Sequence, residues 1–198
     1  MSYLFKSPIT LVIIVLNALV FAGQMIGRLS TEALALSPST WEAHPETVLT
    51  SAFAHADIAH IGMNMLCLVS FAIGGWEARF GSLRFGLIYL GAILGGSAGV
   101  ILLSSPESIT VGASGGVFGI MGAMIAGSIR MRVPLGALFP FITLVTINFA
   151  IGFTGSGISW QGHLGGLVIG FLLAVLIGYK KTSDTPNEQS RTRNRLTE

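Results

Sequence analysis

A serine and a histidine lie in two apolar segments of this sequence. Residues 111–123, VGASGGVFGIMGA, place Ser114 between glycines, and His163 lies in QGHLGG. Each alone is weak evidence, because a serine in an apolar helix usually bonds to its own backbone and an isolated histidine is usually a core residue. Together they could act as the nucleophile and the general base of acyl transfer.

The depth of these residues makes the pair informative. Counted at about 1.5 Å per helical residue, Ser114 and His163 each lie roughly 24 Å from the basic end of their segments. Asn64, in HIGMN, lies roughly 22 Å from the same end. Three polar groups from three segments therefore share one height, with His60 one turn nearer the outer surface.

The same region contains groups that could stabilise an oxyanion. If Ser114 begins a helix, its backbone N–H groups lack acceptors within the helix and point toward a developing negative charge. The side chains of His60 and Asn64 can add donors. Gly112 and Gly115 permit a sharp entry into the helix and a close approach of substrate.

Phe118 is the candidate for orienting the base. It follows Ser114 by four residues, on the same helical face, so its ring can pack against the His163 imidazole. The alternative is an ordinary core or lipid-facing phenylalanine. No buried carboxylate is expected near His163, so the serine and histidine are predicted to act as a dyad.

The elements that position these residues are predicted to be membrane helices. Of the 198 residues, 52% are hydrophobic and 10% charged, and the mean hydropathy is +0.74, which excludes an ordinary soluble domain. Six segments approach the roughly 20 apolar residues that a span needs: 8–26, 59–75, 83–103, 115–129, 134–153 and 160–179. We therefore expect an all-α membrane protein with a bundle of six transmembrane helices.

The charges predict the orientation of the bundle. All of the eleven Lys and Arg residues except Arg28 fall on the side that holds both termini, so the positive-inside rule places both termini in the cytoplasm. The net charge of +2 arises from this placement and indicates no nucleic-acid partner. Residues 1–181 are predicted to form one domain and 182–198 a disordered cytoplasmic tail. The first outer loop, 27–58, is expected to lie partly in the membrane interface.

Glycines recur at every fourth position in three of the predicted spans. Small residues at this spacing let membrane helices approach closely, so we expect the third, fourth and sixth spans to pack together. The positions are Gly91, Gly95 and Gly99, then Gly115 and Gly119, then Gly162, Gly166 and Gly170.

These residues resemble the rhomboid family of intramembrane serine proteases, in its compact six-helix bacterial form. The resemblance covers nearly the whole chain and rests on four motifs, which are HADIAHIGMN, EARFG, GASGG and GHLGG. The sequence departs from the usual family pattern in two places. Glu46 and Thr47 stand where Trp-Arg is common, and Phe118 stands where tyrosine is common.

The resemblance implies a nucleophile, a base and an oxyanion site. Ser114 would be the nucleophile and His163 the base. The oxyanion site would comprise His60, Asn64 and the backbone of Ala113 and Ser114, with Gly112 beside them. The substrates would be single-span or multi-span transmembrane proteins, cleaved within the bilayer near its outer face, with no metal and no cofactor. The expected location is a bacterial inner membrane.

Two other functions remain open. A catalytically inactive relative would share the fold and bind transmembrane clients as an adaptor, although it would not be expected to keep both Ser114 and His163. A small metal or solute transporter could use His55, His60 and His163, but the candidate ligands include no carboxylate and the sequence shows no repeated half.

Overall fold

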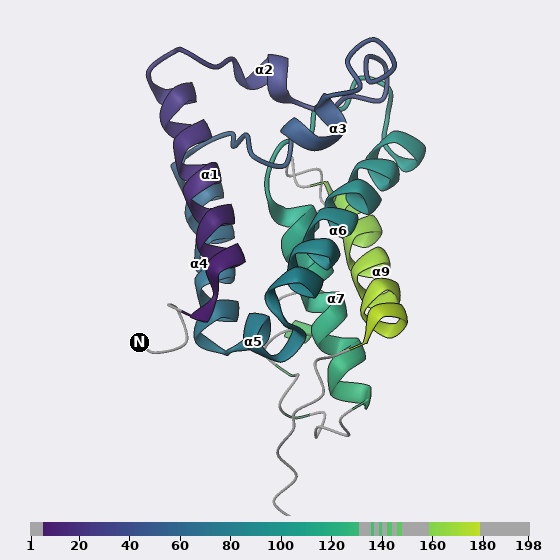
Figure 1. Ribbon diagram of the computed structural model, residues 1–198. Coiled ribbons are helices and arrows are strands. Elements are labelled where there is room, and N and C mark those ends of the chain that lie inside the picture. The colour runs from purple at the N-terminus through teal and green to yellow at the C-terminus, as the bar shows by residue number, and fades with distance from the viewer. Residues whose placement is uncertain are drawn as a thin grey trace, which may run out of the picture.

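The computed structural model describes residues 6–130 and 159–178, with a few single positions between them. Most of these residues are in helices (Figure 1). Within these residues there is no strand, and one isolated bridge pairs Leu36 with Thr110. The helices are α1 Pro8–Met25, α2 Thr31–Leu34, α3 Thr47–Thr50, α4 Ile58–Ile73, α5 Trp76–Phe80, α6 Ser82–Leu103, α7 Ser114–Arg130 and α9 Trp160–Ile177.

Three long helices form the centre of the bundle. α6, α7 and α9 pack against one another, and α1 and α4 form a second group beside them (Figure 1). α5 connects the two groups at one end, while α2 and α3 lie across the opposite end. The first residue of α7 lies toward the α2–α3 end of the bundle.

Glycines bring the three central helices into backbone contact. A Cβ atom on Gly166 of α9 would overlap the carbonyl oxygen of Gly115 in α7. A Cβ atom on the adjacent Gly165 would overlap the carbonyl oxygen of Gly95 in α6. The predicted packing of the glycine-rich spans is thus confirmed, and one of the close approaches between α7 and α9, that of Gly166 to Gly115, lies beside Ser114.

A buried carboxylate ties α5 to the beginning of α1. Glu77 is fully buried and accepts hydrogen bonds from the Ile9 N–H at 3.0 Å, the Thr10 N–H at 2.9 Å and the Thr10 hydroxyl at 2.8 Å. A carboxylate at a helix N-terminus satisfies N–H groups that lack partners within the helix and complements the helix dipole. Glu77 therefore fixes α1 at the end of the bundle opposite Ser114.

Three of the described helices, α1, α6 and α9, are long and apolar enough to cross a membrane. α4 is a shorter apolar helix of 16 residues, and α7 has 17. The predicted span at 134–153 falls mostly outside the described residues, and the predicted tail at 182–198 entirely so. The chain is an all-helical membrane protein, and the count of six spans stays a prediction.

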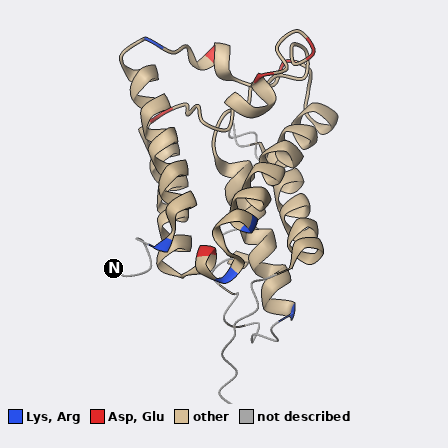
Figure 2. Ribbon diagram, viewed as in Figure 1, with Lys and Arg blue, Asp and Glu red and all other residues tan. Residues whose placement is uncertain are grey.

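Charged side chains separate between the two ends of the bundle. Lys and Arg gather at the α5 end, which holds Lys6, Arg79, Arg84 and Arg130, whereas the α2–α3 end carries most of the acidic residues (Figure 2). The exceptions are Arg28 after α1 and Glu77 in α5.

The first loop, residues 27–58, is folded against the segment that leads into α7. Leu36 and Thr110 exchange two backbone hydrogen bonds, at 3.0 and 2.9 Å. The N–H of Ser39 donates to the carbonyl of Pro106 at 3.1 Å. The loop is therefore attached through its backbone to the chain just before Ser114, a connection absent from the sequence-based prediction.

Candidate active site

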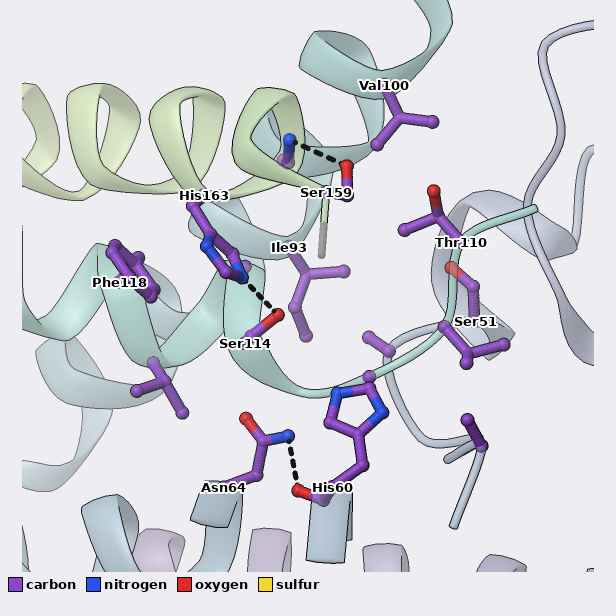
Figure 3. Close-up of a pocket in the computed structure, with 18 of the residues that line it drawn as sticks. Ser51, His60, Asn64, Ile93, Val100, Thr110, Ser114, Phe118, Ser159 and His163 are labelled. Atoms are coloured by element: carbon purple, nitrogen blue, oxygen red, sulfur yellow. Dashed lines mark hydrogen bonds between the residues drawn. The ribbon is translucent and has the colours of Figure 1, made fainter. Parts of the chain in front are cut away.

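Ser114 and His163 are brought into hydrogen-bond contact by α7 and α9. Ser114 is the first residue of α7, and His163 lies in the first turn of α9, whose N-terminus is capped by Ser159 accepting from the Gly162 N–H at 3.2 Å. The distance from Ser114 Oγ to His163 Nε2 is 2.9 Å (Figure 3). When Nε2 carries no proton, the Ser114 hydroxyl donates to it, which is the arrangement in which a histidine can remove the serine proton.

The ring of Phe118 lies flat against the imidazole of His163. Their centroids are 4.0 Å apart and their planes differ by 7° (Figure 3). Phe118 is buried, one turn into α7 from Ser114. The sequence prediction of ring contact between these residues therefore agrees with the structure, and the stacking limits rotation of the imidazole about its χ angles.

Gly112 turns the chain sharply into α7. Its φ is 120°, a conformation that residues with a side chain rarely adopt, and a Cβ atom there would lie 2.6 Å from His60 Nε2. Ala113 follows, fully buried, and Ser114 begins the helix. The first N–H groups of a helix have no acceptor within it, so the backbone at Ser114 presents donors beside its own hydroxyl.

Asn64 and His60 approach the same place from α4. The Asn64 side-chain nitrogen donates to the His60 carbonyl at 3.0 Å. An amide nitrogen carries two N–H groups and this bond uses one, which leaves the other for a ligand. Asp57 caps α4 by accepting from the His60 N–H at 2.8 Å, so the helix that carries both side chains has a defined start.

His55 lies behind His60, in the connection before α4. It is 1% exposed, and its ring meets the His60 ring edge-to-face at 5.1 Å. Burial and, to a smaller extent, the neighbouring His60 together lower the pKa of His55 to about 4, although the Phe53 carbonyl and Asp57 oppose the shift. His55 is therefore neutral at physiological pH.

Across the described ranges, no three His, Cys, Asp or Glu side chains gather closely enough to hold a metal ion.

A cavity of about 780 Å³ opens beside Ser114. Side chains of α4, α6 and α7 line it, mostly apolar ones, together with His60, Asn64 and His163. The first loop also contributes, through Leu36, Ser51 and Ala52. The prediction of the site from the sequence did not include these three loop residues, which reach it because the loop is paired through its backbone with the segment before α7.

The sequence is similar to known proteins over the residues that form this site. The sequence model of the rhomboid domain matches residues 40–180. "RHOMBOID-like protein 6, mitochondrial" of Arabidopsis thaliana is 38% identical over 137 residues, which cover 66% of this chain and 43% of that protein. Rhomboid protease GluP of Bacillus subtilis is 37% identical over 136 residues, which cover 68% of this chain and 26% of GluP. YdcA, also of Bacillus subtilis, is 30% identical over 136 residues, with 68% of each protein covered.

The chain belongs to the rhomboid family, and the match includes every candidate site residue named above. The aligned part spans 43% of the Arabidopsis relative and 26% of GluP, so those proteins contain much sequence outside it. The family and its helical membrane fold are therefore established for this chain, whereas its activity has to be argued from its own site.

Proposed function

We propose that this chain is an intramembrane serine endopeptidase in which Ser114 and His163 act as a catalytic dyad. The observation that carries the proposal is the 2.9 Å contact between Ser114 Oγ and His163 Nε2, made across two helices that glycines hold together. A serine that served only helix packing would bond to its own helix rather than to a histidine 49 residues away. The family relationship to GluP, which is named a protease, supports the same reading.

The first half of the reaction forms an acyl-enzyme. Ser114 Oγ attacks the carbonyl carbon of a peptide bond while His163 Nε2 takes the hydroxyl proton. The tetrahedral intermediate then collapses, the C–N bond breaks, and the imidazolium returns its proton to the leaving amine. The second half repeats these steps with water as the attacking group, which releases the carboxylate product and restores the Ser114 hydroxyl.

The oxyanion of the intermediate would lie between α4 and the N-terminus of α7. The backbone at Ala113 and Ser114 offers N–H donors, and Asn64 and His60 offer side-chain donors from the other side. Only a residue without a side chain lets the chain pass this close to His60, because a Cβ atom at Gly112 would overlap the His60 ring. In this proposal, Phe118 stacks on the His163 ring and keeps its Nε2 directed at the Ser114 hydroxyl, from which it takes the proton.

The substrates in this proposal are transmembrane proteins that enter from the bilayer. α7 begins at Ser114, at the end of that helix nearer α2 and α3, and the basic α5 end would face the cytoplasm by the positive-inside rule. Cleavage would then occur near the outer face, on a segment whose small or helix-breaking residues let it unwind. With six spans, both ends of the domain are cytoplasmic, and we propose the inner membrane of a bacterial cell as its location.

The rival function is a catalytically inactive adaptor that binds transmembrane clients through the same cavity. Incorporation of purified protein into vesicles with a fluorescent transmembrane reporter separates the two. We expect cleavage by the wild-type chain and none by Ser114→Ala. We also expect a fluorophosphonate, from which Ser114 Oγ displaces fluoride, to label the wild type alone. Binding of the reporter without cleavage or labelling would support the adaptor and overturn the proposal.

A further inference from the structure

The segment that leads into Ser114 is held by hydrogen bonds from the first loop. Beyond the bonds that Leu36 and Ser39 make, the N–H of Gly112 donates to the carbonyl of Ser51 at 2.8 Å. Ser51 caps the end of α3. Gly112, which turns the chain into the proposed oxyanion site, is therefore attached directly to the end of α3.

α3 itself is too short to hold its own position. It has four residues, and an isolated helix of that length is unstable in water. One side chain of the central bundle fixes it, since the Ser97 hydroxyl of α6 donates to the Val48 carbonyl at 2.7 Å. Ser97 is 6% exposed and lines the cavity beside Ser114.

Two consecutive contacts thus connect the central bundle to Gly112. Ser97 bonds to Val48 within α3, and Ser51 at the end of α3 bonds to Gly112. Gly112 directly precedes Ala113 and Ser114, so this hydrogen bond holds the backbone at the entry to α7. A displacement of α3 would therefore move the backbone at Ala113 and Ser114.

We infer that Ser97 is a positioning residue for the oxyanion site, acting through α3 on the Gly112 backbone. This inference rests on the proposed protease function, because it assigns the oxyanion to that backbone. The Ser97 hydroxyl donates to the Val48 carbonyl of α3, so its role in this proposal is to place donors rather than to react. The first loop is in this sense part of the catalytic scaffold.

Hydrogen exchange tests the coupling without relying on activity. In Ser97→Ala, we expect the Gly112 amide to exchange faster than in the wild type, because α3 is no longer fixed to α6. Exchange within α9 should stay unchanged. The matched control is Ser70→Ala, which removes an exposed hydroxyl that bonds only to its own helix, at the Leu66 carbonyl. Unchanged exchange at Gly112 in a folded Ser97→Ala protein would overturn the inference.

Kinetics test the consequence for the reaction. Complete loss of one oxyanion donor costs about 10²–10³-fold in kcat, so a displaced donor should cost less, about three- to tenfold, with KM nearly unchanged. Labelling of Ser114 by a fluorophosphonate should slow in parallel. Ser97→Thr keeps the hydroxyl and should lie closer to the wild type than Ser97→Ala. A lower melting temperature with unaltered kcat would show that Ser97 is merely structural.

The outcomes for Ser97 and for the proposed function are separable. If the wild type neither cleaves the reporter nor reacts with the fluorophosphonate, the protease function fails, whatever exchange at Gly112 shows. If the wild type is active and Ser97→Ala equals it in kcat and in Gly112 exchange, only the positioning role fails. Should Ser97→Ala not fold, Ser97→Cys, which keeps a weak S–H donor, takes its place in both measurements.

Discussion

The ring of Phe118 stacks on the imidazole of His163 with centroids 4.0 Å apart and planes 7° from parallel. Such contact is worth about 0.5–1.5 kcal/mol beyond the area buried, and it acts on the one side chain whose orientation decides proton transfer. Phe118 lies in α7, the helix that begins at Ser114, so the proposed nucleophile and the ring that orients the base are held by the same helix.

Replacement of the Phe118 ring should therefore affect turnover. Phe118→Tyr keeps an aromatic ring and should keep activity, whereas Phe118→Leu should lose much of kcat. The control is Phe85→Leu, which removes a fully buried ring in α6 away from the dyad. It should lower the melting temperature and leave kcat nearly unchanged. Equal activity of Phe118→Leu and the wild type would show that another contact orients His163.

Ser114 and His163 are expected to act as one unit. Ser114→Ala and His163→Ala should each abolish cleavage of a transmembrane reporter, while both proteins still purify folded. Because members of a catalytic unit are not additive, the double variant should be no slower than either single one. Appreciable turnover by Ser114→Ala, measured in vesicles, would remove that residue from the role of nucleophile.

Asn64 should contribute to turnover rather than to binding. Asn64→Ala removes one oxyanion donor among several, so kcat should fall by about 10²–10³-fold at most, with KM little changed. Asn17→Ala is a matched control, since both amides donate to the carbonyl four residues earlier, at 3.0 Å for Asn64 and 2.8 Å for Asn17. A raised KM with unaltered kcat would instead assign Asn64 to substrate docking.

Local signals in the sequence were sufficient to locate much of the candidate site. A serine between glycines at the edge of an apolar segment predicts a helix start, and α7 begins at Ser114. Glycines spaced by four predict close helix approach, which in turn places a residue of α9 beside a residue of α7. The meeting of Ser114 and His163 follows from these two regularities together with their equal depth.

The first loop could not be predicted in the same way. Its attachment depends on backbone groups of Leu36, Ser51 and Thr110, and backbone hydrogen bonds between distant segments leave no side-chain pattern to detect. Its mixed polarity instead suggested a loop lying in the membrane interface. Glu77 was likewise identified only as part of a motif, since nothing local indicates that a carboxylate in α5 will be buried against α1.

Stability should decrease in mild acid because of His55. Its pKa is lowered to about 4 in the folded protein, against an unfolded value of about 6.5. Between these values the unfolded chain binds more protons, so the free energy of unfolding falls as pH drops from about 6.5 toward about 4. The groups that face the ring are His60 and Asp57. His55→Phe keeps a ring and should flatten the pH dependence of the melting temperature.

The control for His55 is His44, whose side chain is 63% exposed and pairs with Glu46 at 3.4 Å. His44→Ala removes an exposed imidazole and should leave the melting temperature at neutral pH near that of the wild type. If His55→Phe has the wild-type slope of melting temperature against pH, the acid sensitivity of the protein arises from other groups and His55 does not contribute to it.

The last prediction concerns Glu77, which supports the fold at the end of the bundle far from the chemistry. Its carboxylate accepts three hydrogen bonds from the start of α1 while fully buried. Glu77→Gln replaces one accepting oxygen by a donor group that faces other donors, and an unsatisfied buried donor costs about 1–3 kcal/mol. We expect a clear fall in melting temperature in detergent. Glu107→Gln, in an exposed turn between α6 and α7, should change it little. Because Glu77 contacts α1 and not the Ser114 region, kcat measured well below the melting temperature should stay near that of the wild type. A large loss of kcat in a protein of unaltered stability would mean that the position of α1 is transmitted to the active site, and that the two ends of the bundle are not independent.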